Sequence, residues 1–306
     1  MGKMDLKVTW WNCHLSAPST KAKPGKVTPE FVTVILSLLN DGVDILCLCE
    51  VNEDNCRDLA AYIRAAASVD PKYGLFAVRS LYSKDGNRVD DYGVIFRRDK
   101  LTETSPAVEL NAMADVTEKY LKVGRKLGFK LCGSLDLWLF LCHWQSLRTY
   151  SEDSHIRTEV ASALRGHVKD IYEGDPDALI VICGDFNDEP FSRSIQMTLK
   201  ASRDMSYVRA RSDALFNPFW RLVGITDLVA GSHLPAGTCA SSDPQHLTNW
   251  RTFDQIILSS GFLKGGWSFV GSGVEIISSP DFSGGALSWS DLSDHYPISC
   301  NLKRIV

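Results

Sequence analysis

The sequence predicts a layered α/β fold, in which mixed or antiparallel sheets are covered by helices. Four apolar runs have the length and continuity of strands that are buried on both faces. They cover residues 6–11, 44–49, 137–142 and 178–183. Segments with helical periodicity separate several of them, as in layered α/β proteins. Other neighbouring strand-like runs have no helix between them, which argues against a purely parallel sheet.

Three segments are predicted to be helices. The first begins at Thr28-Pro29-Glu30, which offers a capping hydroxyl, a proline at the first helical position and an acid in the first turn, and it ends at Gly42. The second covers residues 53–67 and the third residues 156–171, each with apolar residues at helical spacing. Loops are predicted at 14–27, 82–91, 202–217, 229–250 and 278–293.

Length and composition indicate one globular domain over residues 1–306. The chain is 44% hydrophobic and 23% charged, with no internal repeat and no linker-like stretch. A formal net charge of −4 argues against binding nucleic acid through global charge, so any phosphate-binding field must be local. The N-terminus is polar, and no apolar run approaches the roughly 18 residues that span a bilayer. We therefore expect a cytoplasmic protein without a membrane span.

The nine cysteines are predicted to be buried, reduced thiols. Their number is odd and their spacing fits neither a disulfide framework nor a zinc site. Most lie inside apolar runs, where a thiol behaves as a small hydrophobe. Cys47 and Cys49 are two residues apart in one strand, so they should share a face of the sheet.

Oxygen-bearing side chains follow two of the buried strands. Asp185 and Asn187 alternate with Phe186 directly after the run 178–183, and Glu50 follows the run 44–49. Carboxylate and amide oxygens suit Mg²⁺ or Mn²⁺. Taken singly, Asp185 is better explained as a turn aspartate and Glu50 as a solvated strand end.

Two further strands begin, rather than end, at polar residues. Asp254 opens one, and Asp294-His295 precedes the other. In an antiparallel arrangement, the ends of some strands and the starts of others share one rim, where these groups can meet. His295 can act near neutral pH when a carboxylate fixes its tautomer, and Asp254 and Asp294 both qualify.

A single histidine more often has no catalytic task. This applies to His143, which ends the run 137–142, until further residues support a role for it. The histidines left without a proposed role are His155, His167, His233 and His246.

Taken in order along the chain, these motifs resemble the endonuclease/exonuclease/phosphatase superfamily, the deoxyribonuclease-like metal phosphoesterases. The matching positions are Asn12, Glu50 in Leu-Cys-Leu-Cys-Glu-Val, His143 in His-Trp-Gln-Ser, Gly-Asp-Phe-Asn-Asp-Glu-Pro at 184–190, Asn-Trp-Arg-Thr-Phe-Asp at 249–254 and Ser-Asp-His-Tyr-Pro-Ile at 293–298. Each motif alone is weak, whereas the ordered set, spanning almost the whole chain, is specific. Residues 217–221 are similar to a segment of some bacterial members. His14 departs from the family pattern, which has a small or apolar residue there.

The resemblance implies a four-layered α/β sandwich, with two mixed β-sheets face to face and helices on the outside. It implies Mg²⁺ or Mn²⁺ as the cofactor. The implied metal ligands are Asn12, Glu50 and Asp294, with Glu50 as the principal one. The implied catalytic residues are His143, Asp185, Asn187, Asp254 and His295. In this scheme Asp185 and Asn187 orient the attacking water and the phosphate, and His295 pairs with Asp254. His143 is the candidate general acid or phosphate clamp.

We predict a metal-dependent nuclease that hydrolyses phosphodiester bonds of DNA or RNA. The segment 184–190 resembles the nuclease and general bacterial branches, because it lacks the basic residue of inositol-phosphatase relatives. The alternatives are the same chemistry on a lipid, an inositol phosphate or another small phosphoester, and an inactive binding scaffold. Candidate substrate-binding residues are Lys21, Lys23, Lys26, Arg148 and Trp250, and the loop residues Phe282 and Trp289 can either stack on bases or pack the loop.

Overall fold

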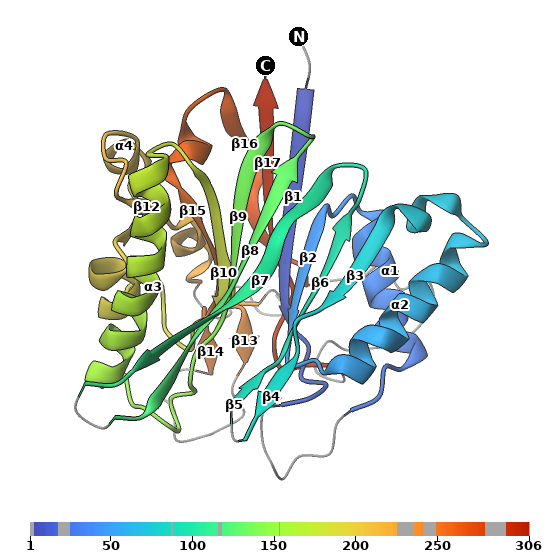
Figure 1. Cartoon of the computed structure of the whole chain (residues 1–306), viewed down its shortest axis with the longest axis horizontal. Coiled ribbons are helices and arrows are strands. Elements are labelled where there is room, and N and C mark those ends of the chain that lie inside the picture. The colour runs from blue at the N-terminus through green and yellow to red at the C-terminus, as the bar shows by residue number, and fades with distance from the viewer. Residues whose placement is uncertain are drawn as a thin grey trace, which may run out of the picture.

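Two large mixed sheets form the centre of the computed structural model (Figure 1). The residues described are 3–17, 25–86, 88–115, 118–152, 154–224, 235–240, 249–278 and 292–305. The first sheet has six strands in the order β16-β17-β1-β2-β6-β3. Their bounds are β1 Lys3–Asn12, β2 Ile45–Cys49, β3 Phe76–Ser80, β6 Tyr92–Arg97, β16 Trp267–Ile276 and β17 Ile298–Ile305. Within it β1 and β2 are parallel and all other neighbours are antiparallel.

The second sheet has seven strands in the order β11-β12-β15-β10-β9-β8-β7. Their bounds are β7 Leu101–Met113, β8 Tyr120–Leu131, β9 Leu135–His143, β10 Leu179–Asp185, β11 Ala201–Ser202, β12 Leu215–Phe216 and β15 Asp254–Ser259. Here β9–β10 and β11–β12 are parallel and the other pairs antiparallel. Two small hairpins accompany the sheets: β4 Ser83–Asp85 with β5 Arg88–Asp90, and β13 Cys239–Ala240 with β14 Trp250–Arg251.

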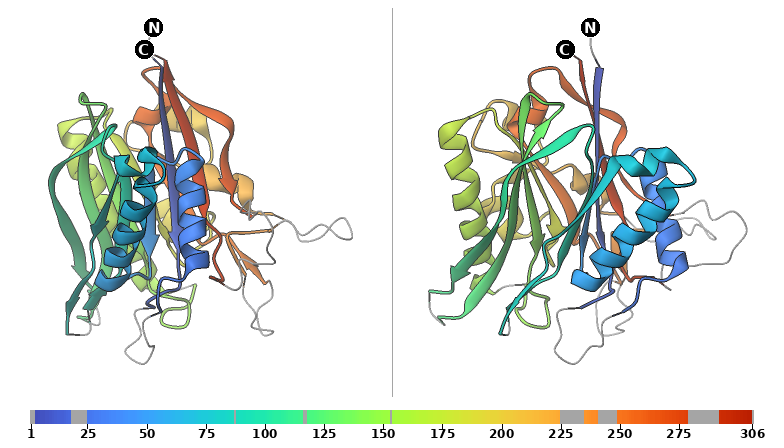
Figure 2. Two further views of the ribbon diagram at one scale, coloured as in Figure 1. Left: turned by 90° about the vertical axis from the view of Figure 1, so that its right-hand side faces the viewer. Right: turned by 45° about the vertical axis from the view of Figure 1, so that its right-hand side comes forward.

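Helices cover the outer faces of both sheets (Figures 1 and 2). The first sheet carries α1 (Pro29–Asn40) and α2 (Glu53–Ala67), and the second carries α3 (His155–Gly174). A short helix, α4 (Met205–Arg209), lies near the edge of the second sheet. Single turns are η1 Pro71–Leu75, η2 Ser194–Thr198, η3 Pro218–Leu222 and η4 Ser260–Leu263. The predicted four-layered sandwich is therefore confirmed.

The alternation of side chains along β1 shows how the layers are specified. Trp10 is buried between the two sheets, together with inward residues of β2, β9 and β10. Trp11 points to the other face and stacks on Phe31 of α1, with ring centroids 4.8 Å apart. Each face of the strand therefore packs against its own apolar layer, as expected for a strand whose apolar residues do not alternate with polar ones.

The local signals for the helices are also present. Thr28 Oγ1 accepts a hydrogen bond from Phe31 N at 3.3 Å, as expected of the first helix cap. A reciprocal capping box between Asn52 and Asn55 begins α2, whose bounds equal the predicted 53–67.

Three predicted loops are wrong in part. Residues 82–91 contain the β4–β5 hairpin, in which Gly86 adopts φ +58°. Residues 202–217 contain α4 and β12, and 229–250 contains β13. Elements of two to five residues are too short to show a periodic pattern, which is why the sequence did not reveal them. The segment 278–293 lies largely outside the described residues.

All nine cysteines are free, and eight of them are buried. Cys47 and Cys49 both face the core between the sheets, so their predicted common face is confirmed. Burial raises the pKa of Cys49, Cys142 and Cys300, which keeps these thiols protonated and unreactive. Across the described residues, no helix has the length and apolar character needed to cross a membrane.

Thiol titration tests this burial. Because Cys132 alone is exposed among the nine cysteines, Ellman's reagent should react quickly with one thiol in the folded protein and with nine after denaturation. Cys132→Ser should remove the fast phase. Fast reaction of several thiols in that variant would contradict the packing described above.

Candidate active site

Strand ends and strand starts meet at one rim of the sandwich, at the end away from the two termini (Figures 1 and 2). The predicted site residues on this rim are Asn12, Glu50, His143, Asp185, Asp254 and His295. Strand register places Asp185 beside His143 of β9 on one side and Asp254 of β15 on the other. Asn12 lies beside Cys49, directly before Glu50. The structure therefore brings the predicted residues of both sheets together.

Glu50 lies at the centre of this rim with one carboxylate oxygen unsatisfied. Asn12 Nδ2 donates to Glu50 Oε1 at 3.3 Å and to Asp185 Oδ2 at 3.1 Å. Glu50 Oε2 is buried and has no hydrogen-bond partner within the described part of the chain. A buried carboxylate oxygen without a donor is costly unless a cation neutralises it. This oxygen-rich set fits a hard divalent cation.

The pair of His295 and the buried Asp254 is held by donors from the first sheet and from the segment before β13. His295 Nδ1 lies 2.7 Å from Asp254 Oδ2. Trp10 Nε1 donates to Asp254 Oδ1 and Thr238 Oγ1 to Asp254 Oδ2, both at 2.9 Å. Of the two carboxylates that the sequence left open as partners of His295, the structure selects Asp254.

The charge of His295 follows from these neighbours. Burial alone would lower its pKa, but Asp254 and Asp185 raise the pKa of His295 to about 10. Its Nε2 lies 3.8 Å from Asp185 Oδ2. Burial in turn raises the pKa of Asp185, an effect that His295 partly offsets.

A second histidine–aspartate pair lies across the rim. His143 Nδ1 is 2.8 Å from Asp91 Oδ2, and His143 Nε2 is 3.7 Å from Glu50 Oε1. Lys122 also pairs with the fully buried Asp91. Burial would lower the pKa of His143, but Asp91 raises it.

Asp91 was missed in the sequence analysis, although a signal was present. It directly precedes the buried strand β6, as Asp254 opens β15. Both strands are antiparallel to a neighbour that ends at the rim, β2 for β6 and β10 for β15. A carboxylate at the start of such a strand therefore predicts a rim residue as well as a carboxylate at a strand end does.

Asp294 is arranged differently from the other expected ligands. Its side chain is 55% exposed, and its Oδ1 lies 3.1 Å from His14 Nδ1. The hydrogen bond to Asp294 raises the pKa of His14. His14, the departure from the family pattern, is thus the partner of an expected ligand rather than an isolated loop residue.

Cys239, Asp254 and His295 have ligand atoms within 4.8 Å of one another, close enough to hold an ion. Two arguments favour Glu50 as the centre of the metal site instead. Burial raises the pKa of Cys239 and keeps its thiol protonated, and Asp254 already accepts the hydrogen bonds described above. These three groups are better explained as a hydrogen-bonded pair beside a buried thiol.

Asn187 adopts a left-handed backbone conformation with φ +49°. Its N–H donates to Asp185 Oδ1 at 3.0 Å, and its Nδ2 donates to the carbonyl of Trp144 at 3.0 Å. Asparagine tolerates this conformation better than most residues. The turn thereby holds Asn187 beside Asp185, as the sequence analysis expected.

Three of the five candidate substrate-binding residues lie in the described part of the chain. Lys26 and Arg148 are exposed, and Trp250 lies half-buried with its ring 5.8 Å from that of Tyr296. The start of the loop 14–27, which carries the three lysines, is held at the rim, because Ser16 N donates a hydrogen bond to the carbonyl of Glu50 at 2.6 Å. Predicted residues outside the described part of the chain are Lys21, Lys23, His233, His246, Phe282 and Trp289.

Solved structures share this fold over nearly their whole length. The human Nocturnin catalytic domain, solved with a bound sulfate anion, is 17% identical, has a TM-score of 0.56, and is matched over 98% of this chain and 96% of its own. A family protein from Bacteroides thetaiotaomicron is 15% identical, with a TM-score of 0.57 and coverage of 100% and 97%. TDP2 from D. rerio, complexed with a single-strand DNA product, is 16% identical, with a TM-score of 0.54 and coverage of 97% and 98%.

The sequence itself is matched at the level of the family. No curated protein sequence matches the chain. The model of the Endonuclease/Exonuclease/phosphatase family matches residues 23–304, which is almost all of it. The chain therefore belongs to the endonuclease/exonuclease/phosphatase family, whose members are metal-dependent hydrolases of phosphoesters.

Proposed function

We propose that this protein is a metal-dependent nuclease that hydrolyses phosphodiester bonds of DNA or RNA. The observation that carries the proposal is the rim itself: an unsatisfied Glu50 oxygen lies on the same rim as two histidine–aspartate pairs whose carboxylates are buried. One of the similar folds, that of D. rerio TDP2, was solved with a single-strand DNA product, which supports nucleic acid as the substrate class.

Mg²⁺ or Mn²⁺ is the proposed cofactor, held by Glu50 with help from Asn12 and Asp294. When bound, such an ion acts as a Lewis acid that stabilises charge on the phosphate oxygens. Asn12 contributes by fixing the distance between the carboxylates of Glu50 and Asp185, to both of which it donates. The carboxylate of Asp294 is also paired with His14.

The remaining residues position the reactants and carry protons. Asp185 and Asn187 hold the attacking water and the phosphate. His295, held as an imidazolium between Asp254 and Asp185, offers its Nε2–H to the charge that develops on phosphate oxygens. His143, held by Asp91, lies across the rim and is placed to clamp the phosphate or protonate the leaving oxygen.

A substrate screen tests the proposal as a whole. Purified protein with Mg²⁺ or Mn²⁺ should cleave labelled single-stranded DNA, duplex DNA or RNA. The same preparation should leave phosphoinositides and sphingomyelin intact. Cleavage of a lipid or inositol phosphate without cleavage of any nucleic acid would overturn the nuclease assignment, and a lack of any hydrolysis would favour an inactive binding scaffold.

Removal of the Glu50 charge should abolish metal binding. For wild-type protein, Mg²⁺ at about 100 times its dissociation constant should stabilise the fold by about 2.7 kcal/mol. Glu50→Gln should lose this effect and most activity, because the nearly isosteric amide keeps the shape but not the charge. Thermal denaturation with and without chelator measures the stabilisation of the fold by the metal. Glu53→Gln, an exposed neighbour, is the matched control. Equal metal stabilisation of Glu50→Gln and wild type would rule out Glu50 as the principal ligand.

Three rim substitutions should each slow turnover. Asp185→Asn, His143→Ala and His295→Ala are expected to lower kcat by about 10² or more, the size of general acid–base and electrostatic contributions. Asp185→Asn is the sharpest test because it is nearly isosteric. The exposed Asp213→Asn serves as control. Near-normal kcat for Asp185→Asn on a confirmed substrate would remove Asp185 from the mechanism.

Asp91→Asn should lower the pKa of His143 in chelator-treated protein, because Asp91 is what raises it. An NMR titration of the imidazole measures this. The pair stabilises the wild-type fold fully below about pH 6.5, the ordinary histidine pKa, and this contribution is lost as pH rises through the raised pKa of His143. Asp90→Asn is the control, since Asp90 pairs with Arg125 at 2.6 Å instead. An unchanged His143 pKa in Asp91→Asn would contradict the pairing.

A further inference from the structure

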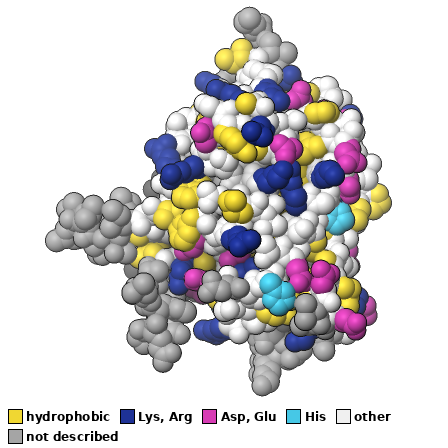
Figure 3. All heavy atoms as spheres, turned by 90° about the vertical axis from the view of Figure 1, so that its left-hand side faces the viewer, with side chains coloured by type: hydrophobic (Ala, Val, Ile, Leu, Met, Phe, Trp, Pro, Cys, Tyr) yellow, Lys and Arg dark blue, Asp and Glu magenta, His cyan; other side chains and the backbone are white. Residues whose placement is uncertain are grey.

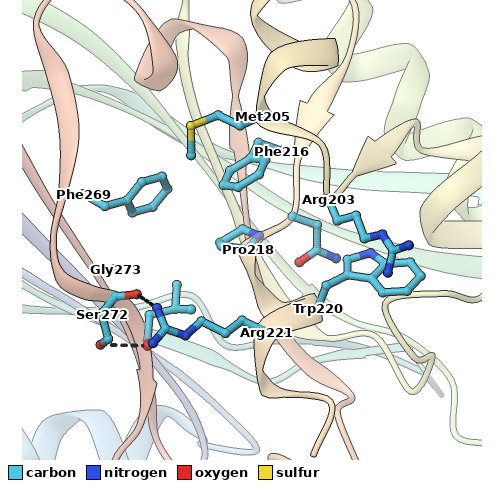
Figure 4. Close-up of a pocket in the computed structure, with 11 residues that line it drawn as sticks. Arg203, Met205, Phe216, Pro218, Trp220, Arg221, Phe269, Ser272 and Gly273 are labelled. Atoms are coloured by element: carbon cyan, nitrogen blue, oxygen red, sulfur yellow. Dashed lines mark hydrogen bonds between the residues drawn. The ribbon is translucent and has the colours of Figure 1, made fainter.

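A cavity separate from the catalytic rim opens beside β16, an edge strand of the first sheet. It lies between β16 of the first sheet and the β12–η3 segment of the second (Figure 4). Its volume is about 270 Å³. Apolar side chains form much of its wall: Met205, Phe216, Phe269 and Val274. We call this cavity the side pocket.

The charged side chains of the side pocket are positive. Its eleven described lining residues include Arg203 and Arg221 but no carboxylate. The Arg203 guanidinium lies over the ring of Trp220, 4.7 Å from its centroid. Arg221 Nη1 donates to the carbonyl of Ser272 at 2.9 Å, which fixes it at the mouth. Trp220 Nε1 is buried and has no acceptor among the residues described.

Trp220 connects the side pocket to the catalytic segment. Phe191 directly follows the motif 184–190, is 52% exposed, and packs edge-on against Trp220 with ring centroids 6.1 Å apart. At the other end of η3, the carbonyl of Leu222 accepts a hydrogen bond from Thr252 Oγ1 at 3.5 Å, two residues before Asp254. Phe191 and Trp220 therefore form an aromatic contact between the segment that follows the motif and the side pocket.

The segment that contributes most of the side-pocket lining is basic, although the protein as a whole is not. Residues 191–224 contain six Lys and Arg residues against two Asp and no Glu, in a chain of net charge −4. On the face that Figure 3 shows, basic side chains lie among hydrophobic and acidic ones. Local positive charge of this kind attracts phosphates, and aromatic side chains beside it offer surfaces on which bases stack.

We propose that the side pocket binds one unpaired base of a single-stranded nucleic acid, with the flanking phosphates on Arg203 and Arg221. Its volume lies just below the roughly 300 Å³ at which pockets for small-molecule ligands begin, so it suits one ring system. The apolar walls accept the base, which stacks on the Trp220 ring that lines the pocket. Paired bases of a duplex cannot enter. This proposal rests on the proposed nuclease function and adds a subsite that favours single strands.

Binding of a short labelled single-stranded DNA is measured by fluorescence anisotropy in chelator, so that no cleavage occurs. Trp220→Ala should weaken binding roughly fivefold to a hundredfold, the range for loss of one base–aromatic stack, with a much smaller effect on duplex DNA. Arg203→Gln and Arg221→Gln should each lower the log–log salt slope by roughly 0.7. Ser272→Phe, a change of an exposed mouth residue, should block the pocket and weaken binding without altering the core.

Arg211→Gln is the matched control. Arg211 also lies over an aromatic ring, that of Tyr207 at 4.9 Å, but it does not line the side pocket. If Trp220→Ala and Ser272→Phe fold normally and bind single strands as Arg211→Gln does, the subsite is refuted. Equal losses for duplex and single strand would also refute it, as would binding of anionic lipid vesicles in place of DNA.

The two proposals fail separately. Cleavage of nucleic acid together with wild-type binding by the pocket variants would overturn the side pocket alone. Absence of any nucleic-acid cleavage, together with single-strand binding that depends on Trp220 and Ser272, would overturn the nuclease assignment and support the pocket.

Discussion

Asp254 of the second sheet is fully buried, yet its carboxylate accepts hydrogen bonds from Trp10 of the first sheet, from Thr238, and from His295 in the segment that precedes β17. Trp10 belongs to the first sheet, Asp254 to the second, and His295 lies just before a strand of the first. A buried carboxylate is tolerated only when its oxygens are satisfied, so these donors cannot be removed one at a time without cost. The bond between Trp10 and Asp254 also fixes how the two sheets sit at the rim. The distance from His295 Nε2 to Asp185 depends on that placement.

The position of the site follows from the burial of the strands. The central strands are apolar on both faces because each lies between the facing sheet and a layer of helices. Such strands leave room for polar side chains only where they end or begin. Since β1, β2, β9 and β10 end at the same edge at which β15 begins, the chemistry of the whole chain collects there. Helix caps contribute as well, because the capping residue Asn55 accepts a hydrogen bond from Ser16 in the loop beside Glu50.

Much of this could be predicted from the sequence, and what could not has identifiable causes. The apolar runs fixed the strands that carry Asn12, Glu50, His143 and Asp185, and the common rim followed from their order. The choice between Asp254 and Asp294 as the partner of His295 depends on strand register and on Trp10 and Thr238, which no local pattern reveals. The role of Asp91 required knowing that β6 runs antiparallel beside β2. Short elements such as β4, β5 and α4 owe their structure to tertiary contacts and single caps, so their sequences read as loops.

The charge balance of the rim explains why substrate contacts belong at its periphery. Five carboxylates converge there: Glu50, Asp91, Asp185, Asp254 and Asp294. The basic groups near these carboxylates are His143, His295, His14 and Lys122. Each of them already pairs with one of the five carboxylates. A phosphodiester approaching this rim without a cation at Glu50 meets net negative charge, so attraction must come from that cation and from basic residues outside the rim. Lys26, Arg148 and the arginines of the side pocket occupy such outer positions. The rim carboxylates can therefore orient the histidine imidazoles, while the basic residues outside the rim attract the polyanionic substrate. Because different residues serve the two purposes, attraction of the substrate does not disturb the histidine–carboxylate pairs.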